Sequence, residues 1–480
     1  MATISSAGIG SGLDVNGIVT QLVALERKPI NQLKTEATKL QTQLSSFGKL
    51  QAALSKLRET ASTLTRSSAW TPTKGSSSDA AAVGVTTGAA TPPGNYSITV
   101  SRLAAAQSVV AVTKASSTEV VGQGTLRIEL GSWSAGQTSF TAKAGVTPVD
   151  IAVGPGEDSL ATIRDRINAA SAGVVASIVN DASGARLVVR SLDSGVENAF
   201  RITATDIDGN NCDAAGLSAL AFDPSAGITQ MTQSVAAANA SATINGLPIT
   251  SASNTLTDVI DGLTLRLGRE SATPVEVSVN VDNEAIRKSI DEFVTAYNDL
   301  VTQLGELTKY DAASKSAGTL QGDRAAVNLQ AQLRSILSAT SGASAVFTRL
   351  ADIGLDPQAD GKIKVTSTKL DAASGRLTEL RRLFANSDTL VPANDGFATR
   401  LRAFGDLTLG SDGPLTTRQD GLRQRIDRNS DRQQQLEERV AQIEKRLRAQ
   451  YTTLDARMAQ LNQLSNYVTQ QVAQYNKPTK

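Results

Sequence analysis

The sequence predicts an α+β multidomain protein, in which long terminal coiled-coil helices and a helical-bundle domain flank inserted, mainly antiparallel β domains. Three observations support this fold class. Apolar residues recur at every seventh position near both chain ends, alternate with polar residues in the middle, and return to helical spacing after residue 283. With 480 residues, the chain is also long enough for three or four hydrophobic cores.

Residues 1–66 are predicted to contribute the N-terminal helices of the terminal coiled coil and the start of the helical domain. Because proline lacks a backbone N–H and restrains the residue before it, Pro29 should separate a short helix from a long one. Residues 67–79, rich in Ser, Thr, Gly and Pro, are predicted to be a linker. The apolar positions of the two helices are Ile18, Leu22 and Leu25, then Leu33, Leu40, Phe47 and Leu54.

The middle of the chain is predicted to be mostly antiparallel β structure, because apolar and polar residues alternate over short runs. One helix interrupts the β pattern, with Ser159 as its N-cap, and two strands joined near Gly184 follow it. This order suggests an inner β domain made of residues 80–105 plus 235–281. Residues 106–234 would form an outer α+β domain inserted into it.

The remainder is predicted to be helical. From Asn283, apolar residues step four, three, four, three along the chain, and helical spacing continues through leucines 370, 377, 380 and 383. Alternation on either side of Asp360 predicts a β-hairpin. Residues 282–415 are therefore expected to form a helical domain with a hairpin. Residues 416–480 should form a coiled-coil helix about 90 Å long.

The last helix carries a regular apolar series at Val440, Leu447, Leu454, Leu461 and Val468. Gln433 interrupts this series, and the second heptad position shifts to Tyr451 and Met458 before Leu464 restores it. Such a widened seam is expected when a helix packs against more than one neighbour. Two interpretations stay open: the terminal helices pack only on each other, or they also assemble with other chains.

The predicted assembly interface combines both ends of the chain. Burying each Leu or Val of such a face stabilises by roughly 1.5–3 kcal/mol, so the face should not stay in water. Its residues are Leu13, Ile18, Leu22, Leu33, Leu40 and Phe47 near the N-terminus, and Val440, Leu447, Tyr451, Leu454, Met458, Leu461, Leu464 and Val468 near the C-terminus.

The composition argues against several classes of function. Lys plus Arg number 47 and Asp plus Glu 46, so we expect no binding to nucleic acid or to an anionic membrane. No apolar run reaches the roughly 18 residues of a membrane span, and residues 1–10 lack the pattern of a secretory signal. With no histidine and one cysteine, Cys212, neither the usual transition-metal sites nor a disulfide framework is expected.

Motifs for catalysis are weak. The glycines of residues 8–12 lack the spacing of a dinucleotide loop. Residues 206–211 resemble a calcium loop, but Leu217 stands where a bidentate Glu should be. An acid/base pair would need two of Asp206, Asp208 and Asp223, and nothing in the sequence brings them together. We therefore predict no enzyme activity, no cofactor and no metal site.

Four stretches carry a resemblance that covers nearly the whole chain. Residues 8–30 (GIGSGLDVNGIVTQLVALERKPI) and 451–472 (YTTLDARMAQLNQLSNYVTQQV) look like the opening and the closing helix of one family. Residues 242–267 look like its β region, and residues 158–191 look like an insertion motif shared with flagellins and hook-associated proteins. On these motifs the chain resembles the bacterial flagellar filament cap family, also called flagellar hook-associated protein 2.

The resemblance implies a ring-like homo-oligomer at the distal tip of the filament that promotes folding and insertion of exported flagellin. It also implies a role in motility, export through the flagellar type III channel, and an extracellular location at the flagellum tip. Implied partners are other copies of the chain, flagellin, hook–filament junction proteins and an export chaperone. The terminal helices would then seat in the helical core of the filament.

An alternative function is an extracellular adhesin. Its β domains would bind host glycans or a receptor, with the helices as a stalk and with Trp133 and Tyr96 available to stack on sugars. Deletion of residues 106–234 should leave assembly intact if this insertion is adhesive, and abolish assembly if it builds the cap.

Overall fold

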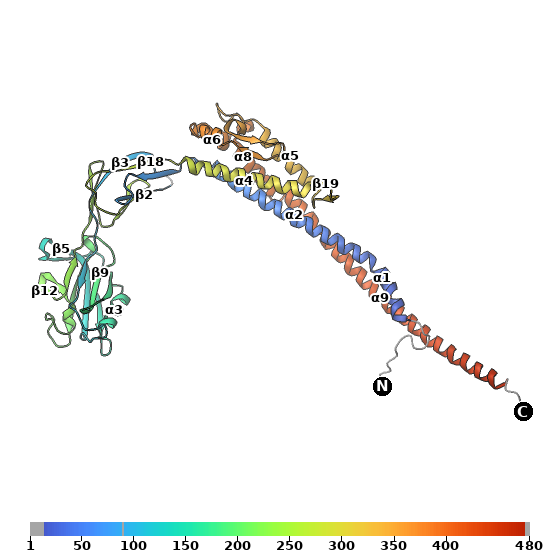
Figure 1. The fold of residues 1–480 in the computed structure, drawn as a ribbon, viewed down its shortest axis with the longest axis horizontal. Coiled ribbons are helices and arrows are strands. Elements are labelled where there is room, and N and C mark those ends of the chain that lie inside the picture. The colour runs from blue at the N-terminus through green and yellow to red at the C-terminus, as the bar shows by residue number, and fades with distance from the viewer. Residues whose placement is uncertain (1–13, 89–90, 476–480) are drawn as a thin grey trace. The chain divides into compact units, whose positions relative to one another are not determined.

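The computed structural model describes residues 14–88 and 91–475 (Figure 1). The chain forms two compact units. A helical unit contains both ends of the chain, up to Trp70 and from Ile286 onward, and a β unit spans Thr71–Ala285. The predicted fold class is confirmed, because helices flank sheets whose strands pair antiparallel.

The helical unit is built from eight named helices and two short hairpins in the described part of the chain. The hairpins pair β19 (Tyr310–Asp311) with β20 (Ser316–Ala317), and β21 (Leu355–Pro357) with β22 (Ile363–Val365). The helices are α1 (Val15–Glu26), α2 (Lys28–Thr65), α4 (Asn283–Thr308), α5 (Arg324–Ser338), α6 (Ser367–Ser374), α7 (Leu377–Ala385), α8 (Phe397–Leu409) and α9 (Pro414–Tyr475).

Local sequence signals explain where several helices begin and end. Asp14 caps α1 by accepting a hydrogen bond from the Gly17 N–H at 2.8 Å. Proline lies in the first turn of α2, where its missing N–H costs little, so the predicted break at Pro29 is confirmed. The single helical pattern expected across residues 370–383 is in fact two helices. α6 stops at Gly375, and α7 starts two residues later.

The main helical core lies between α2, α4, α7 and α8. Phe47 and its apolar neighbours on α2 are fully buried there. Three aromatic rings meet at its centre: the Phe384 ring lies 5.7 Å from Trp70 and 6.0 Å from Phe293, centroid to centroid. The Trp70 Nε1–H donates to the Leu64 carbonyl at 2.8 Å, so the buried indole keeps its hydrogen bond. The core therefore joins segments from both ends of the chain.

The inner part of the β unit has its own hydrophobic core between a five-stranded sheet, β1-β18-β3-β14-β15, and a three-stranded sheet, β16-β17-β2. The expected linker at 67–79 is corrected, because β1 lies inside it and pairs with the valine-rich β18. The strands are β1 (Thr73–Ser77), β2 (Val83–Thr87), β3 (Gly94–Arg102), β14 (Ala240–Ile244), β15 (Leu247–Ser251), β16 (Thr255–Ile260), β17 (Leu263–Leu267) and β18 (Val275–Val281).

The outer part of the β unit has a second core between two sheets and α3 (Leu160–Ala169). One sheet has the order β12-β11-β10-β5-β6, with β7 also paired to β5, and the other has the order β13-β4-β9-β8. The strands are β4 (Ser108–Val110), β5 (Gly124–Trp133), β6 (Phe140–Ala142), β7 (Val149–Val153), β8 (Val174–Asp181), β9 (Gly184–Ser191), β10 (Ala199–Asp206), β11 (Phe222–Asp223), β12 (Ile228–Thr229) and β13 (Thr232–Val235).

Two predicted features of this outer part are confirmed. Ser159 caps α3 by accepting from the Thr162 N–H at 3.2 Å. β8 and β9 are joined by a tight turn that leads into Gly184, the first residue of β9; Gly184 has φ of +127°, and a Cβ there would lie 2.2 Å from the Lys114 carbonyl oxygen. Only glycine fits that position without moving the backbone.

Candidate assembly interface

One face of α1 packs against α9. Val15, Val19 and Val23 lie one helical turn apart, and all three are buried. With Ile30 of α2 and Val440 of α9 they form a small hydrophobic cluster, which we call the distal cluster. Figure 1 shows α1 running beside α9, with the C-terminal part of α9 continuing past it. The first and the last helix of the described chain thus pack against each other.

The buried face of α1 was not among the predicted interface residues. Ile18 and Leu22 were predicted to lie in the interface, but both are only half-buried, and Leu25 is 55% exposed. The valines at four-residue spacing were the signal that could have identified the face against α9. α1 is therefore apolar on two faces, and only one of them is covered by the described residues.

α2 runs antiparallel to α9 along the same seam. Gln419 pairs with Gln51 at 2.8 Å near one end, while Val440 meets Ile30 near the other. The ion pair Lys34–Glu437, at 3.5 Å, borders the seam, but both side chains are 58% exposed. Exposed pairs of this kind contribute little, so apolar burial and the amide contacts determine the register.

A polar layer separates the distal cluster from the main helical core. Asn429 is only 7% exposed, and its Oδ1 accepts a hydrogen bond from Nε2 of the half-buried Gln433. Leu422 packs in the main core on one side, and Val440 packs in the distal cluster on the other. A buried amide pair in a helical seam lowers stability and restricts register. This layer is the physical basis of the interruption that the sequence shows at Gln433.

The predicted interface residues fall into three groups. Leu40, Phe47 and Val440 are buried inside the chain, which corrects their assignment to a surface for other chains. Leu33, Leu447, Tyr451 and Met458 are half-buried, as are the two predicted residues of α1. Leu13 lies outside the described residues. The exposed group is Leu454 (43%), Leu461 (58%), Leu464 (58%) and Val468 (51%).

The exposed group and Val472, 53% exposed, form what we call the distal stripe. At about 100° per residue, its five side chains fall within an arc of about 80° on α9. The same arithmetic places Val440, Leu447 and Tyr451 next to that arc. The distal stripe therefore continues the face that α1 covers, at a level where no described residue covers it.

The distal part of α9 also differs in charge. No Asp, Glu, Lys or Arg occurs from Met458 to Tyr475, whereas the turns before it contain Glu444, Lys445 and Arg448. Loss of charged residues is typical of the centre of protein interfaces. A solvated helix usually carries mixed charges, so this segment has the composition of a helix that becomes buried.

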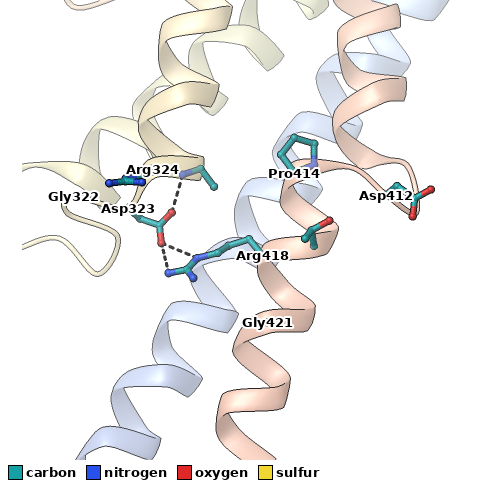
Figure 2. Close-up of a pocket in the computed structure, with 9 residues that line it drawn as sticks. Gly322, Asp323, Arg324, Asp412, Pro414, Arg418 and Gly421 are labelled. Carbon is teal, nitrogen blue, oxygen red and sulfur yellow. Dashed lines mark hydrogen bonds and ion pairs between the residues drawn. The ribbon is translucent and has the colours of Figure 1, made fainter.

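An ion pair fixes the start of α9 against α5 (Figure 2). Arg418 donates from Nε and Nη2 to Asp323 Oδ2 at 2.9 and 2.7 Å, while Asp323 Oδ1 accepts from the Ala325 N–H at 3.0 Å. The Asp323 side chain is 6% exposed and thus caps α5 and anchors α9 at once. The pair lines a hollow of about 620 Å³. Its polar groups serve contacts within the chain, so we assign it no ligand.

Asp206, a candidate for calcium binding or acid/base chemistry in the sequence, has a structural role. Asp206 is 7% exposed and accepts from the Ser218 N–H at 2.9 Å, so it closes a loop. Within the residues described, no group of three or more Cys, Asp or Glu side chains is placed to hold a metal ion. No described helix is both long and apolar enough to cross a membrane.

Comparison with known proteins places these helices in a family. The flagellar hook-associated protein 2 of Escherichia coli (strain K12) is 31% identical over 98% of both chains. That of Salmonella typhimurium (strain LT2) is 31% identical over 99% of this chain and all of the relative.

The chain belongs to the flagellar hook-associated protein 2 family. Family models match residues 11–107 (flagellar hook-associated protein 2 N-terminus), 237–463 (flagellar hook-associated protein 2 C-terminus) and 139–193 (flagellin hook IN motif). The first two matches contain α1, α2 and most of α9, and hence every residue of the distal cluster.

Solved structures agree with the family assignment. The crystal structure of the flagellar cap protein FliD D1-D2-D3 domains from Escherichia coli is 30% identical in sequence and superposes with a TM-score of 0.60. The match covers 79% of this chain and 99% of the solved one. The likeness therefore extends to the fold as well as to the sequence.

Proposed function

We propose that this chain caps a flagellar filament. It would form a ring-like oligomer at the extracellular tip and promote folding and insertion of exported flagellin subunits. Support comes from the family, from a relative solved as a flagellar cap protein, and from the distal stripe. The stripe carries the proposal because it is apolar, uncharged over its last turns, and continuous with a face already covered by a helix.

The proposed partners follow from the chemistry of the stripe. Five aliphatic side chains on one helix face suit apolar faces of neighbouring helices, supplied by other copies of this chain and by terminal helices of flagellin. Burial would contribute roughly 1.5–3 kcal/mol per side chain as an upper estimate. Contacts with hook–filament junction proteins and with an export chaperone are part of the same proposal.

The experiment compares two charge insertions on opposite faces of α9. In cells that lack the native gene, Leu454→Asp is expected to release flagellin into the medium and leave filaments short, because it places a carboxylate in the stripe. Gln463→Asp adds the same charge about 180° away on the helix and should give normal filaments. Both variants should keep the helical content of the native chain by circular dichroism. Normal filaments from a secreted Leu454→Asp chain would refute the proposal.

A further inference from the structure

A pocket of about 400 Å³ lies in the outer part of the β unit, at the end of β5. Its volume is within the range of roughly 300–1,000 Å³ found for small-molecule sites. Every residue that lines it is uncharged. The lining residues are Trp133, Ser134, Gly136, Gln137, Val196, Ala199, Gln233, Ala236 and Ala237.

Trp133, the aromatic residue of the pocket, is held in place by hydrogen bonds and by contacts with two other rings. The Trp133 Nε1–H points inward, to Gln107 Oε1 at 3.2 Å and to the Phe200 carbonyl at 3.3 Å. Gln107 is fully buried and also bonds the backbone of Phe200 in both directions, at 2.9 and 3.0 Å. Phe140 and Phe222 pack on the indole at 4.7 and 5.9 Å between centroids. The half-buried ring thus offers carbon atoms, not a donor, to the pocket.

Two glutamine amides form the polar wall. Gln137 Nε2 donates to Gln233 Oε1 at 2.7 Å. Among the described residues, Gln137 Oε1 and Gln233 Nε2 make no hydrogen bond, so the amide pair that lines the pocket keeps an unused carbonyl acceptor and an unused NH2 group. Gln137 has φ of +59° in the turn between β5 and β6, a conformation that Asn or Gly adopts more easily. This turn directs its amide across to β13.

We infer that this pocket binds a neutral sugar ring. A pyranose has an apolar C–H face for the indole and hydroxyl groups that both donate and accept for the two amides. A purely apolar ligand would leave the amides without partners, and a charged ligand would meet no opposite charge in the lining. The inference does not depend on the cap proposal. A sugar site at Trp133 would supply the contact that the adhesin alternative requires.

The test uses tryptophan fluorescence of the full-length chain. The chain has two tryptophans, and Trp70 is 1% exposed in the helical unit, so a sugar-dependent change reports on Trp133. Methyl β-D-galactopyranoside, added up to about 100 mM, is expected to give a saturable change with a dissociation constant on the order of 1–10 mM. Sodium galacturonate, the charged counterpart, should bind more weakly. Absence of a saturable change with the neutral sugar would overturn the inference.

Two glutamine variants locate the site. Gln233→Ala removes a pocket amide and should weaken galactoside binding about tenfold. Gln230→Ala changes a half-buried glutamine of the same domain that does not line the pocket and whose amide donates to the Cys212 carbonyl, and it should leave binding unchanged. Saturation-transfer NMR of the sugar gives a second readout for Trp133→Phe, which should abolish the signal. Native-like binding by Gln233→Ala would overturn the inference. Because Gln233→Ala should still cap filaments, the two proposals fail separately.

Discussion

Removing the polar layer of the α2–α9 seam should join the distal cluster to the main helical core. We consider the double variant Asn429→Leu with Gln433→Leu. A buried leucine contributes roughly 1.5–3 kcal/mol, and the half-buried position about half of that. The lost amide hydrogen bond subtracts about 1 kcal/mol. The seam should therefore gain about 1.3–3.5 kcal/mol, which lowers the equilibrium constant for local opening by roughly tenfold to a few hundredfold.

Hydrogen exchange measures this gain locally. In the native chain, amides of α1 and of α9 around Val440 should exchange faster than amides of the main core, because few apolar contacts hold them. In the double variant their protection should rise by that factor. Arg432→Leu, an exposed change between the two sites, should shift protection by less than about 0.5 kcal/mol. Equal protection in the native and double-variant chains, or an equal rise with Arg432→Leu, would refute the reasoning.

Three further predictions concern stability. Val19→Ala should destabilise the α1–α9 pairing by about 1–3 kcal/mol, seen as loss of exchange protection in α1 with the main core unchanged. Asp323→Ala should lower the free energy of unfolding of the helical unit by about 2 kcal/mol in urea melts, because it removes a cap and frees a half-exposed arginine. The unfolding free energy should change little from pH 5 to 8, since the chain has no histidine, and should fall below about pH 4. Two carboxyl groups contribute to this acid loss. A hydrogen bond from the Ser344 hydroxyl lowers the pKa of Glu379, and a hydrogen bond from the Asn394 side-chain amide lowers the pKa of Asp388. A carboxylate whose pKa is lowered in the folded state stabilises the fold at pH values above its ordinary pKa, and this stabilisation is lost as the pH falls through the folded-state pKa. Asp388→Asn should therefore reduce the loss of unfolding free energy at acid pH, measured in melts at a series of pH values.

The sequence predicted most of the fold because periodicity reports burial directly. The terminal helices, the capped α3 and the β21–β22 hairpin all follow from local patterns. β1 escaped prediction because its Ser, Gly and Thr residues carry no apolar alternation, and its pairing with β18 is set by the partner strand. The break between α6 and α7 was missed since a single glycine is tolerated in many helices.

The candidate interface was only partly predictable. A heptad series shows that a face of α9 is apolar, but it does not show where the partner helix stops. That boundary, near Tyr451, depends on how α1 folds back, which is a tertiary property. The same limit applies to α1, where six apolar residues allow two faces and only packing selects the valines. The glutamine pair beside Trp133 joins positions 96 residues apart, beyond any local pattern.

The meeting of the two chain ends has a consequence for the order of folding. Arg448 Nη1 donates a hydrogen bond to Asn16 Oδ1, which lies 432 positions earlier in the chain, so the helical unit cannot close while a nascent chain is still being made. The β unit is complete in sequence by residue 285 and is free to fold first. Until synthesis passes Arg448, α1 lacks its partner segment of α9, and its apolar face stays exposed to other proteins in the cell.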